Sequence, residues 1–133
     1  MTYFLDTNMC VYYLKGVYPI IISKLLSLKP IDVKIPSIVK AELLYGVEKS
    51  VQRDNNVQKI EAFLLPMEII PFGNSAAIQY GRIRAALEKS GMVIGPNDLI
   101  IAATVLAENG ILVTNNVKEF NRIPELRLEN WIA

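Results

Sequence analysis

Short apolar runs alternate with longer helical patterns along the whole sequence. The runs predict strands at residues 2–5, 33–35, 68–71 and 111–114, with a weaker one at 127–128. The intervening patterns predict helices at residues 9–14, 19–28, 38–50, 55–65, 75–90, 97–109 and 117–121. Alternation of this kind forms βαβ units, so we expect an α/β fold with a mainly parallel sheet of four to five strands. The 133 residues suit one domain, spanning 1–133.

Two absences limit the chemistry open to this chain. The sequence contains no histidine and one cysteine, Cys10. Catalysis by Ser-His-Asp or Cys-His groups, zinc sites that include histidine, and disulfides within the chain are therefore excluded. If the chain is an enzyme, carboxylates must carry the reaction, and carboxylates without imidazole suit hard cations such as magnesium or manganese.

Charge and hydropathy narrow the range of partners. Fourteen basic against thirteen acidic side chains give a net charge of +1, which argues against a strongly basic binding stripe. Affinity for nucleic acid must then come from local patches or bound cations. The apolar runs are too short or too interrupted to span a bilayer, and no signal-peptide pattern is present. We therefore expect a cytoplasmic protein with no membrane partner.

Asp6 ends the first predicted strand, in the stretch YFLDTN. Aspartate, threonine and asparagine all cap helices, because their side chains accept hydrogen bonds from free backbone N–H groups. Asp6 can therefore be a simple cap. One helix needs one cap, however, and Thr7 or Asn8 also suits that position, which leaves Asp6 as a candidate functional carboxylate.

Glu42 lies in a predicted helix whose cap we assign to Ser37. None of its neighbours three or four positions away is basic, so no helical ion pair accounts for this charge. Arg84 and Glu88, by contrast, stand four residues apart and predict an ordinary surface pair. An exposed glutamate without a special role is an equal alternative for Glu42.

Asp98 opens the segment NDLIIAATVLAENG, a predicted helix that is apolar nearly all round and is therefore expected to be buried. A carboxylate in the first turn of a helix is favoured by the helix dipole, so a structural role is one interpretation. Asn97 is an equally good cap, and a buried charge is costly. We favour a functional role for Asp98.

A fourth group lies in LVTNNVKEF. Thr114 ends a predicted buried strand, as Asp6 ends the first. Asn116 and Glu119 have the spacing of a capping box, in which both side chains bind free N–H groups. That structural role is the favoured interpretation for either residue taken singly, and it does not exclude a second role in the same crevice.

Taken together, these groups follow strands or open the helices that come next. Open parallel sheets bind ligands beyond the carboxyl ends of their strands. Two like charges about 4 Å apart repel by roughly 4 kcal/mol at an effective dielectric of about 20, so several carboxylates share a cleft only when cations neutralise them. Magnesium does so, and it also activates water and stabilises the leaving oxygen of a phosphodiester. The pattern predicts metal-assisted hydrolysis.

Four segments in order, FLDTN, AELLYGVEKS, GPNDLIIAA and LVTNNVKEF, resemble the PIN-domain ribonucleases and, more narrowly, the VapC toxins of bacterial type II toxin–antitoxin pairs. The likeness covers essentially the whole chain, including RIPELRLENW. It implies a three-layer α/β/α PIN-like fold. It further implies an endoribonuclease that hydrolyses RNA phosphodiesters with magnesium or manganese held by four acidic residues.

The resemblance also implies roles for individual residues. Asp6 and Asp98 match the direct metal ligands, and Glu42 matches an acid that assists directly or through water. Many relatives carry aspartate where this chain has Asn116, and Glu119 is the expected substitute as the fourth catalytic acid. The residues expected to support the site through hydrogen bonds are Thr114, Asn116 and Asn8.

Partners follow from the same resemblance. It implies a homodimer, a cognate VapB-type antitoxin whose C-terminal segment blocks the acidic cleft, and structured RNA, often transfer RNA, as the substrate. Basic residues that can contact phosphates, or can equally be solvated surface charges, are Lys15, Lys40, Lys49, Arg82 and Lys118.

Other classes of protein remain as alternatives. Phosphatases of the haloacid dehalogenase type also begin with a strand that ends in aspartate, but they need a second aspartate two residues later, where this chain has Asn8. A receiver domain needs an aspartate at the end of a middle strand, and IDVKIPS has none there. A binding module whose acids merely hold a structural cation is the non-enzymatic alternative.

Overall fold

The computed structural model describes residues 1–132, and Ala133, the last residue of the predicted domain, lies outside the described residues. Five strands form one sheet in the order β3-β2-β1-β4-β5, with every neighbouring pair parallel. Their bounds are β1 (Tyr3–Leu5), β2 (Val33–Pro36), β3 (Glu68–Ile70), β4 (Ile111–Val113) and β5 (Arg127–Glu129). The predicted parallel α/β sheet is confirmed, and the weak last strand is part of it.

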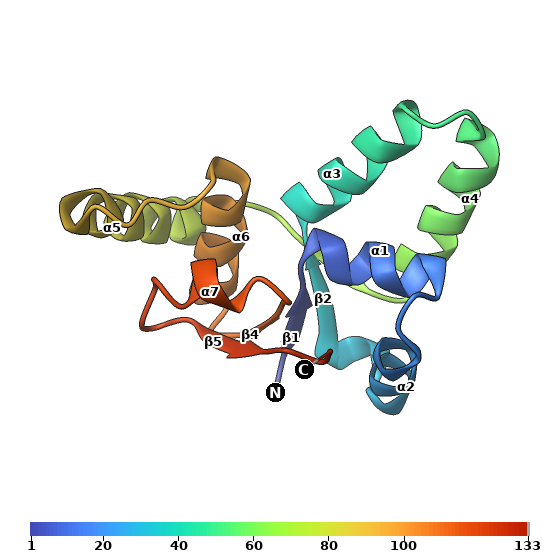
Figure 1. The fold of residues 1–133 in the computed structure, drawn as a ribbon, viewed down its shortest axis with the longest axis horizontal. Helices are drawn as coiled ribbons and strands as arrows, with labels where there is room; N and C mark the ends of the chain where they lie inside the picture. Colours follow the sequence, from blue (N-terminus) through green and yellow to red (C-terminus); the bar gives the residue numbers. More distant parts are fainter. Residues whose placement is uncertain (133) are drawn as a thin grey trace.

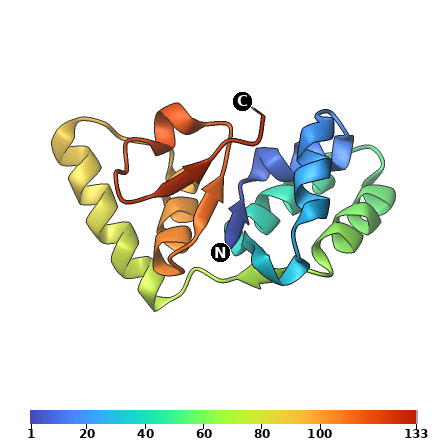
Figure 2. The same ribbon diagram turned by 90° about the horizontal axis from the view of Figure 1, so that it is seen from below.

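Helices cover both sides of the sheet and give a three-layer α/β/α architecture (Figures 1 and 2). Both views show the helices of the N-terminal half on one side of the molecule and α5 and α6 on the other. The helices are α1 (Thr7–Lys15), α2 (Pro19–Ser27), α3 (Ser37–Glu48), α4 (Arg53–Leu64), α5 (Asn74–Ser90), α6 (Pro96–Ala107) and α7 (Val117–Phe120).

The predicted elements agree with the observed bounds to within two residues, because their apolar periodicity is strong. One short 3₁₀ helix at Pro30–Asp32 was not predicted, since three residues are too few to show a helical period. The predicted Ser37 cap is wrong. Ser37 is the first residue of α3 and no side chain caps this helix, because β2 runs through Pro36 directly into it.

The core is aliphatic and centres on β1, β4 and α6. Phe4 and Leu112, on neighbouring strands, are fully buried, and α6 buries Leu99 and the run from Ile101 to Val105. Strands buried on both faces are typical of parallel sheets covered by helices. The buried strands fix the position of the residues that directly follow them.

The carboxyl ends of β1 and β4 lie side by side. The backbone N–H of Asp6 donates to the carbonyl oxygen of Val113 at 3.2 Å, and that of Thr114 donates to Glu129 at 3.0 Å. Asp6 and Thr114 are therefore the first residues beyond two adjacent strands. Their side chains start from the same edge of the sheet.

Among residues 1–132, no single helix is long and apolar enough to cross a membrane. Helices α1 and α2 are long and apolar enough only when they are taken together, and the pair is bent by 106° at the break between them.

Gly110, between α6 and β4, tests how tightly this core is packed. A methyl group on its Cα would lie 2.5 Å from Cε2 of the buried Phe4 ring and 3.3 Å from the carbonyl oxygen of Thr2. We expect Gly110→Ala to lower the free energy of unfolding by about 1–3 kcal/mol in urea titrations, because the ring has no room to move. Gly81→Ala is the control: nothing lies within 4 Å of its added methyl, and helix propensity predicts a gain of about 0.5–1 kcal/mol. Equal stability of the two variants would contradict this account.

Candidate functional site

Asp6 is buried just beyond β1, with 6% of its surface exposed. It caps α1, since its Oδ1 accepts a hydrogen bond from the backbone N–H of Met9 at 2.9 Å. Its Oδ2 accepts one from the hydroxyl of Thr114 at 2.6 Å. Of the three residues considered as the cap, Asp6 is the one used, so the prediction that Thr7 or Asn8 makes it unnecessary there is wrong: Asp6 has the extended backbone of an N-cap residue and Thr7 is already helical.

The surroundings of Asp6 disfavour its charge. Burial raises the pKa of the Asp6 carboxyl, the hydrogen bonds from Thr114 and Met9 lower it, and the charge of Glu42 raises it. The raising effects prevail. Asp6 thus serves as a helix cap and is also a desolvated carboxylate within reach of another acid.

Glu42 reaches from α3 to two other segments. Its Oε1 accepts a hydrogen bond from the hydroxyl of Thr7 at 2.6 Å, and its Oε2 accepts one from the side-chain amide of Asn97 at 3.2 Å. Thr7 is the first residue of α1, and Asn97 lies in the first turn of α6. Both oxygens of this half-buried carboxylate are therefore held from outside its own helix.

Asp98 lies in the first turn of α6, half-buried, and no side chain caps this helix. Burial is the main cause that raises the pKa of Asp98 to about 6, and the charges of Glu119, Asp6 and Glu42 add to it. Charges act on one another over roughly 10 Å in salt solution. Asp6, Glu42 and Glu119 therefore lie near enough to Asp98 for their charges to act on it.

Glu119 is held between two segments as well. Its Oε2 accepts from the side-chain amide of Asn116 at 2.8 Å, and its Oε1 accepts from the backbone N–H of Gly95 at 3.2 Å. The hydrogen bond from Asn116 is the main cause that lowers the pKa of Glu119. The predicted capping box is wrong: Asn116 makes no side-chain capping bond, and its backbone N–H donates to the hydroxyl oxygen of Thr114 at 2.9 Å and not to Glu119.

Neutral donors alone hold these carboxylates. In residues 1–132, no lysine or arginine nitrogen lies within 4.0 Å of Asp6, Glu42, Asp98 or Glu119. The carboxylate of Asp98 accepts no hydrogen bond within the same part of the chain. The donors to the other three are the hydroxyls of Thr7 and Thr114, the amides of Asn97 and Asn116, and the backbone N–H groups of Met9 and Gly95.

A divalent cation fits the chemistry of this donor set. In the described part of the chain, no three acidic, histidine or cysteine side chains lie close enough to surround an ion. The carboxylates are nonetheless oxygen ligands that form no ion pair within the described residues, and oxygen ligands are what magnesium and manganese require. The pKa of Asp98 is raised mainly by burial, and the charges of the neighbouring acids add to this effect.

Sequence reasoning missed two of the residues that contact the acids. Thr7 and Asn97 were considered only as helix caps, and both donate to Glu42 instead. Asn8, expected to support the site, is exposed on α1, and within residues 1–132 its side chain makes no hydrogen bond to an acid. The sequence did indicate that Thr7 and Asn97 belong to the site, because Thr7 directly follows Asp6 and Asn97 directly precedes Asp98.

A groove of about 420 Å³ between α1, α3 and α4 is lined by Glu42, Thr7 and Lys15. Of the other candidate phosphate contacts, Arg82 pairs with Glu125 at 3.3 Å, and Lys49 lies over the ring of Tyr45, 4.9 Å from its centroid. Lys15 lines the same groove as Glu42.

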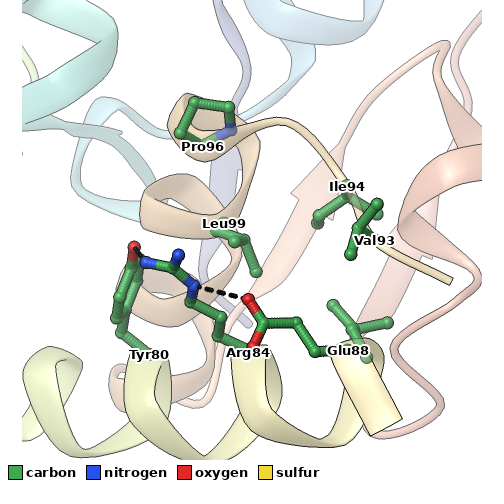
Figure 3. Close-up of a pocket in the computed structure, with 8 residues that line it drawn as sticks. Tyr80, Arg84, Glu88, Val93, Ile94, Pro96 and Leu99 are labelled. Carbon is green, nitrogen blue, oxygen red and sulfur yellow. Dashed lines mark hydrogen bonds and ion pairs between the residues drawn. The ribbon is translucent and has the colours of Figure 1, made fainter. Parts of the chain in front are cut away.

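A separate cavity of about 300 Å³ lies between α5 and the start of α6 (Figure 3). None of the four carboxylates lines it. Nε of Arg84 donates to Glu88 at 3.1 Å and Nη1 donates to the hydroxyl of Tyr80 at 2.9 Å, as Figure 3 shows. The predicted surface pair of Arg84 and Glu88 is confirmed.

Comparison with known proteins gives consistent matches. The model of the PIN domain family matches residues 3–126. Ribonuclease VapC2 of Rickettsia felis is 48% identical over 132 residues, which cover 98% of each chain. The tRNA(fMet)-specific endonuclease VapC of Salmonella typhimurium is 37% identical over 131 residues, again 98% of each chain.

Solved structures agree with this result. That of VapBC2 from Rickettsia felis, bound to a DNA fragment from their promoter, contains a chain with a TM-score of 0.93 and 47% identity, over 98% of this chain and 99% of that one. The DNA-bound VapBC of Salmonella typhimurium has a TM-score of 0.92 and 37% identity, over 98% of both chains.

The raised pKa of Asp98 makes stability depend on pH. Unfolded, this carboxyl titrates near 3.8, and folded near 6. Between these values the folded chain keeps a proton that the unfolded chain has lost, so the free energy of unfolding falls as the pH rises. With EDTA present, we expect Asp98→Asn to raise the free energy of unfolding by about 1–2 kcal/mol at about pH 8, after allowance for solvent screening, and to change it little at about pH 4.

Urea titrations at both pH values check this expectation. Glu61→Gln, which changes an exposed glutamate on α4, is the control and should have the same small effect at either pH. If Asp98→Asn raises the free energy of unfolding equally at low and high pH, the raised pKa of Asp98 is not the cause of the gain.

Proposed function

The chain belongs to the PIN domain family and, within it, to the VapC ribonucleases, and from this premise we propose that it hydrolyses RNA phosphodiester bonds with magnesium or manganese held by its acidic residues. The observation that carries the proposal is that, among residues 1–132, none of these four carboxylates pairs with a lysine or arginine nitrogen within 4.0 Å. Repulsion among them opposes the folded state, and a bound cation relieves it.

Asp6 and Asp98 are the proposed direct ligands. Asp6 is fixed by Met9 and Thr114, and Asp98 offers a carboxylate that the described residues leave without a hydrogen bond. When bound, the cation supplies charge that activates a water molecule and stabilises the leaving oxygen of the phosphodiester. The chain's own part is to hold these oxygens in place and to keep basic side chains away from them.

Glu119 is the proposed fourth acid. It contributes to the raised pKa of Asp98, so its charge acts on the site. Asn116 donates to Glu119 and orients it, and Thr114 does the same for Asp6. Hydrogen bonds of this kind commonly orient the ligands of a metal.

Substrate and partners come from the relatives. Transfer RNA is the proposed substrate, since the relative in Salmonella typhimurium is named a tRNA(fMet)-specific endonuclease. A VapB-type antitoxin is the proposed partner, since the similar solved structures are VapBC complexes. A homodimer and a cytoplasmic location, where transfer RNA is found, complete the proposal.

Asp6→Asn tests the reaction. The amide oxygen still accepts from Met9, but the charge is lost, so we expect cleavage of a labelled transfer RNA to slow by at least about 100-fold. Purified, antitoxin-free protein should stop cutting in EDTA and resume when manganese is added. Glu88→Gln, at the cavity of Figure 3, is the control and should cut at the parent rate. If Asp6→Asn cuts as fast as the parent, a contaminant or another site is responsible.

The fourth acid has its own test. If Glu119 holds this role, Glu119→Gln should weaken the binding of Mn²⁺ by about tenfold, and Asn116→Ala should weaken it less, because the charge remains when only its donor is removed. Titration calorimetry with Mn²⁺ alone measures both. The reverse order of effects would reject the assignment to Glu119.

A further inference from the structure

Glu42 depends on its neighbours for its position. Asp6 follows a buried strand and caps a helix, whereas Glu42 extends from α3 on a side chain with three rotatable bonds. The charges of Asp6 and Asp98 lie near enough to interact with it. Without a restraint, repulsion and side-chain entropy would both turn Glu42 toward solvent.

Two hydrogen bonds provide that restraint. Thr7 holds Oε1 at 2.6 Å and Asn97 holds Oε2 at 3.2 Å. Thr7 directly follows Asp6, and Asn97 directly precedes Asp98. The same two bonds therefore fix Glu42 relative to both proposed metal ligands.

The neutrality of the two donors matters. A lysine or arginine at either position would hold Glu42 more strongly, but its charge would also cancel the charge that a cation needs. A hydroxyl and an amide orient the carboxylate without adding a positive charge beside it. The choice of threonine and asparagine therefore suits a site that binds a cation.

We propose that Thr7 and Asn97 are positioning residues that fix Glu42 between the segments carrying Asp6 and Asp98. The inference rests on the proposed function and deepens it. Neither residue touches the substrate in this assignment; both act through Glu42. Their removal should therefore have no effect once Glu42 is gone.

The experiment compares variants in two backgrounds. In the parent chain, Thr7→Val and Asn97→Ala should each weaken Mn²⁺ binding in calorimetry by about tenfold and lower kcat more than they change KM for a labelled transfer RNA. Thr7→Ser keeps the hydroxyl and should stay within about threefold of the parent. In a Glu42→Ala background, Thr7→Val and Asn97→Ala should change neither quantity further.

Several results would overturn the inference. One is Mn²⁺ affinity at the parent value in both Thr7→Val and Asn97→Ala. Another is a loss of Mn²⁺ affinity that is equal in the parent chain and in the Glu42→Ala background, which would mean that Thr7 and Asn97 do not act through Glu42. Urea titrations check that each variant folds. If Thr7→Val does not fold, Asn97→Ala, at an exposed position, tests the positioning role alone.

The two proposals can fail separately. If Asp6→Asn abolishes cleavage while the Thr7 and Asn97 variants match the parent, the nuclease proposal stands and the positioning role is wrong. If the parent neither binds Mn²⁺ nor needs it to cut, the metal-dependent function is wrong, and the positioning role falls with it.

Discussion

Repulsion among Asp6, Glu42, Asp98 and Glu119 works against the fold, because among residues 1–132 no lysine or arginine nitrogen lies within 4.0 Å of any of them. Two like charges about 4 Å apart would cost roughly 4 kcal/mol at an effective dielectric of about 20, against a typical net stability of about 5–15 kcal/mol. The aliphatic core around β1, β4 and α6 has to offset that cost. Apart from the hydrogen bond with which Asp6 caps α1, a site of this kind is maintained by the rest of the molecule while its charges are unneutralised.

The parallel sheet decides which charges meet. Because β1 and β4 are adjacent and run the same way, Asp6 and Thr114 lie beside each other although 108 residues separate them. Helices that start at this edge then direct Asp98 and Glu119 inward from α6 and α7. An antiparallel arrangement of the same strands would place Asp6 and Thr114 at opposite edges. The order and direction of the strands are thus the physical origin of the site.

Sequence reasoning reached the sheet and the helices because apolar periodicity is a local pattern. It also selected four carboxylates, from a charge after a strand, a helical glutamate with no ion-pair partner, and acids in the first turns of helices, and the charges of the other three act on Asp98 in the structure. It failed for the hydrogen bonds. Thr7 and Asn97 look like caps, and their real acceptor, Glu42, lies 35 and 55 residues away. The capping box failed for the same reason, since Gly95, from another segment, donates to Glu119. Rules based on neighbouring residues cannot predict hydrogen bonds with distant parts of the chain.

The asparagine at position 116 follows from the same physics. The resemblance to VapC toxins implies an aspartate there, yet Asn116 donates to Glu119 at 2.8 Å and lowers its pKa. An aspartate would lose that donor and place a fifth negative charge beside Glu119, which would favour a protonated or displaced carboxyl. Asparagine keeps Glu119 ionised and in position at the cost of one ligand charge. If Glu119 is the fourth acid, as proposed, the departure from the family pattern and the use of Glu119 are one change: the charge stands at position 119 in place of position 116, and Asn116 donates the hydrogen bond that holds it.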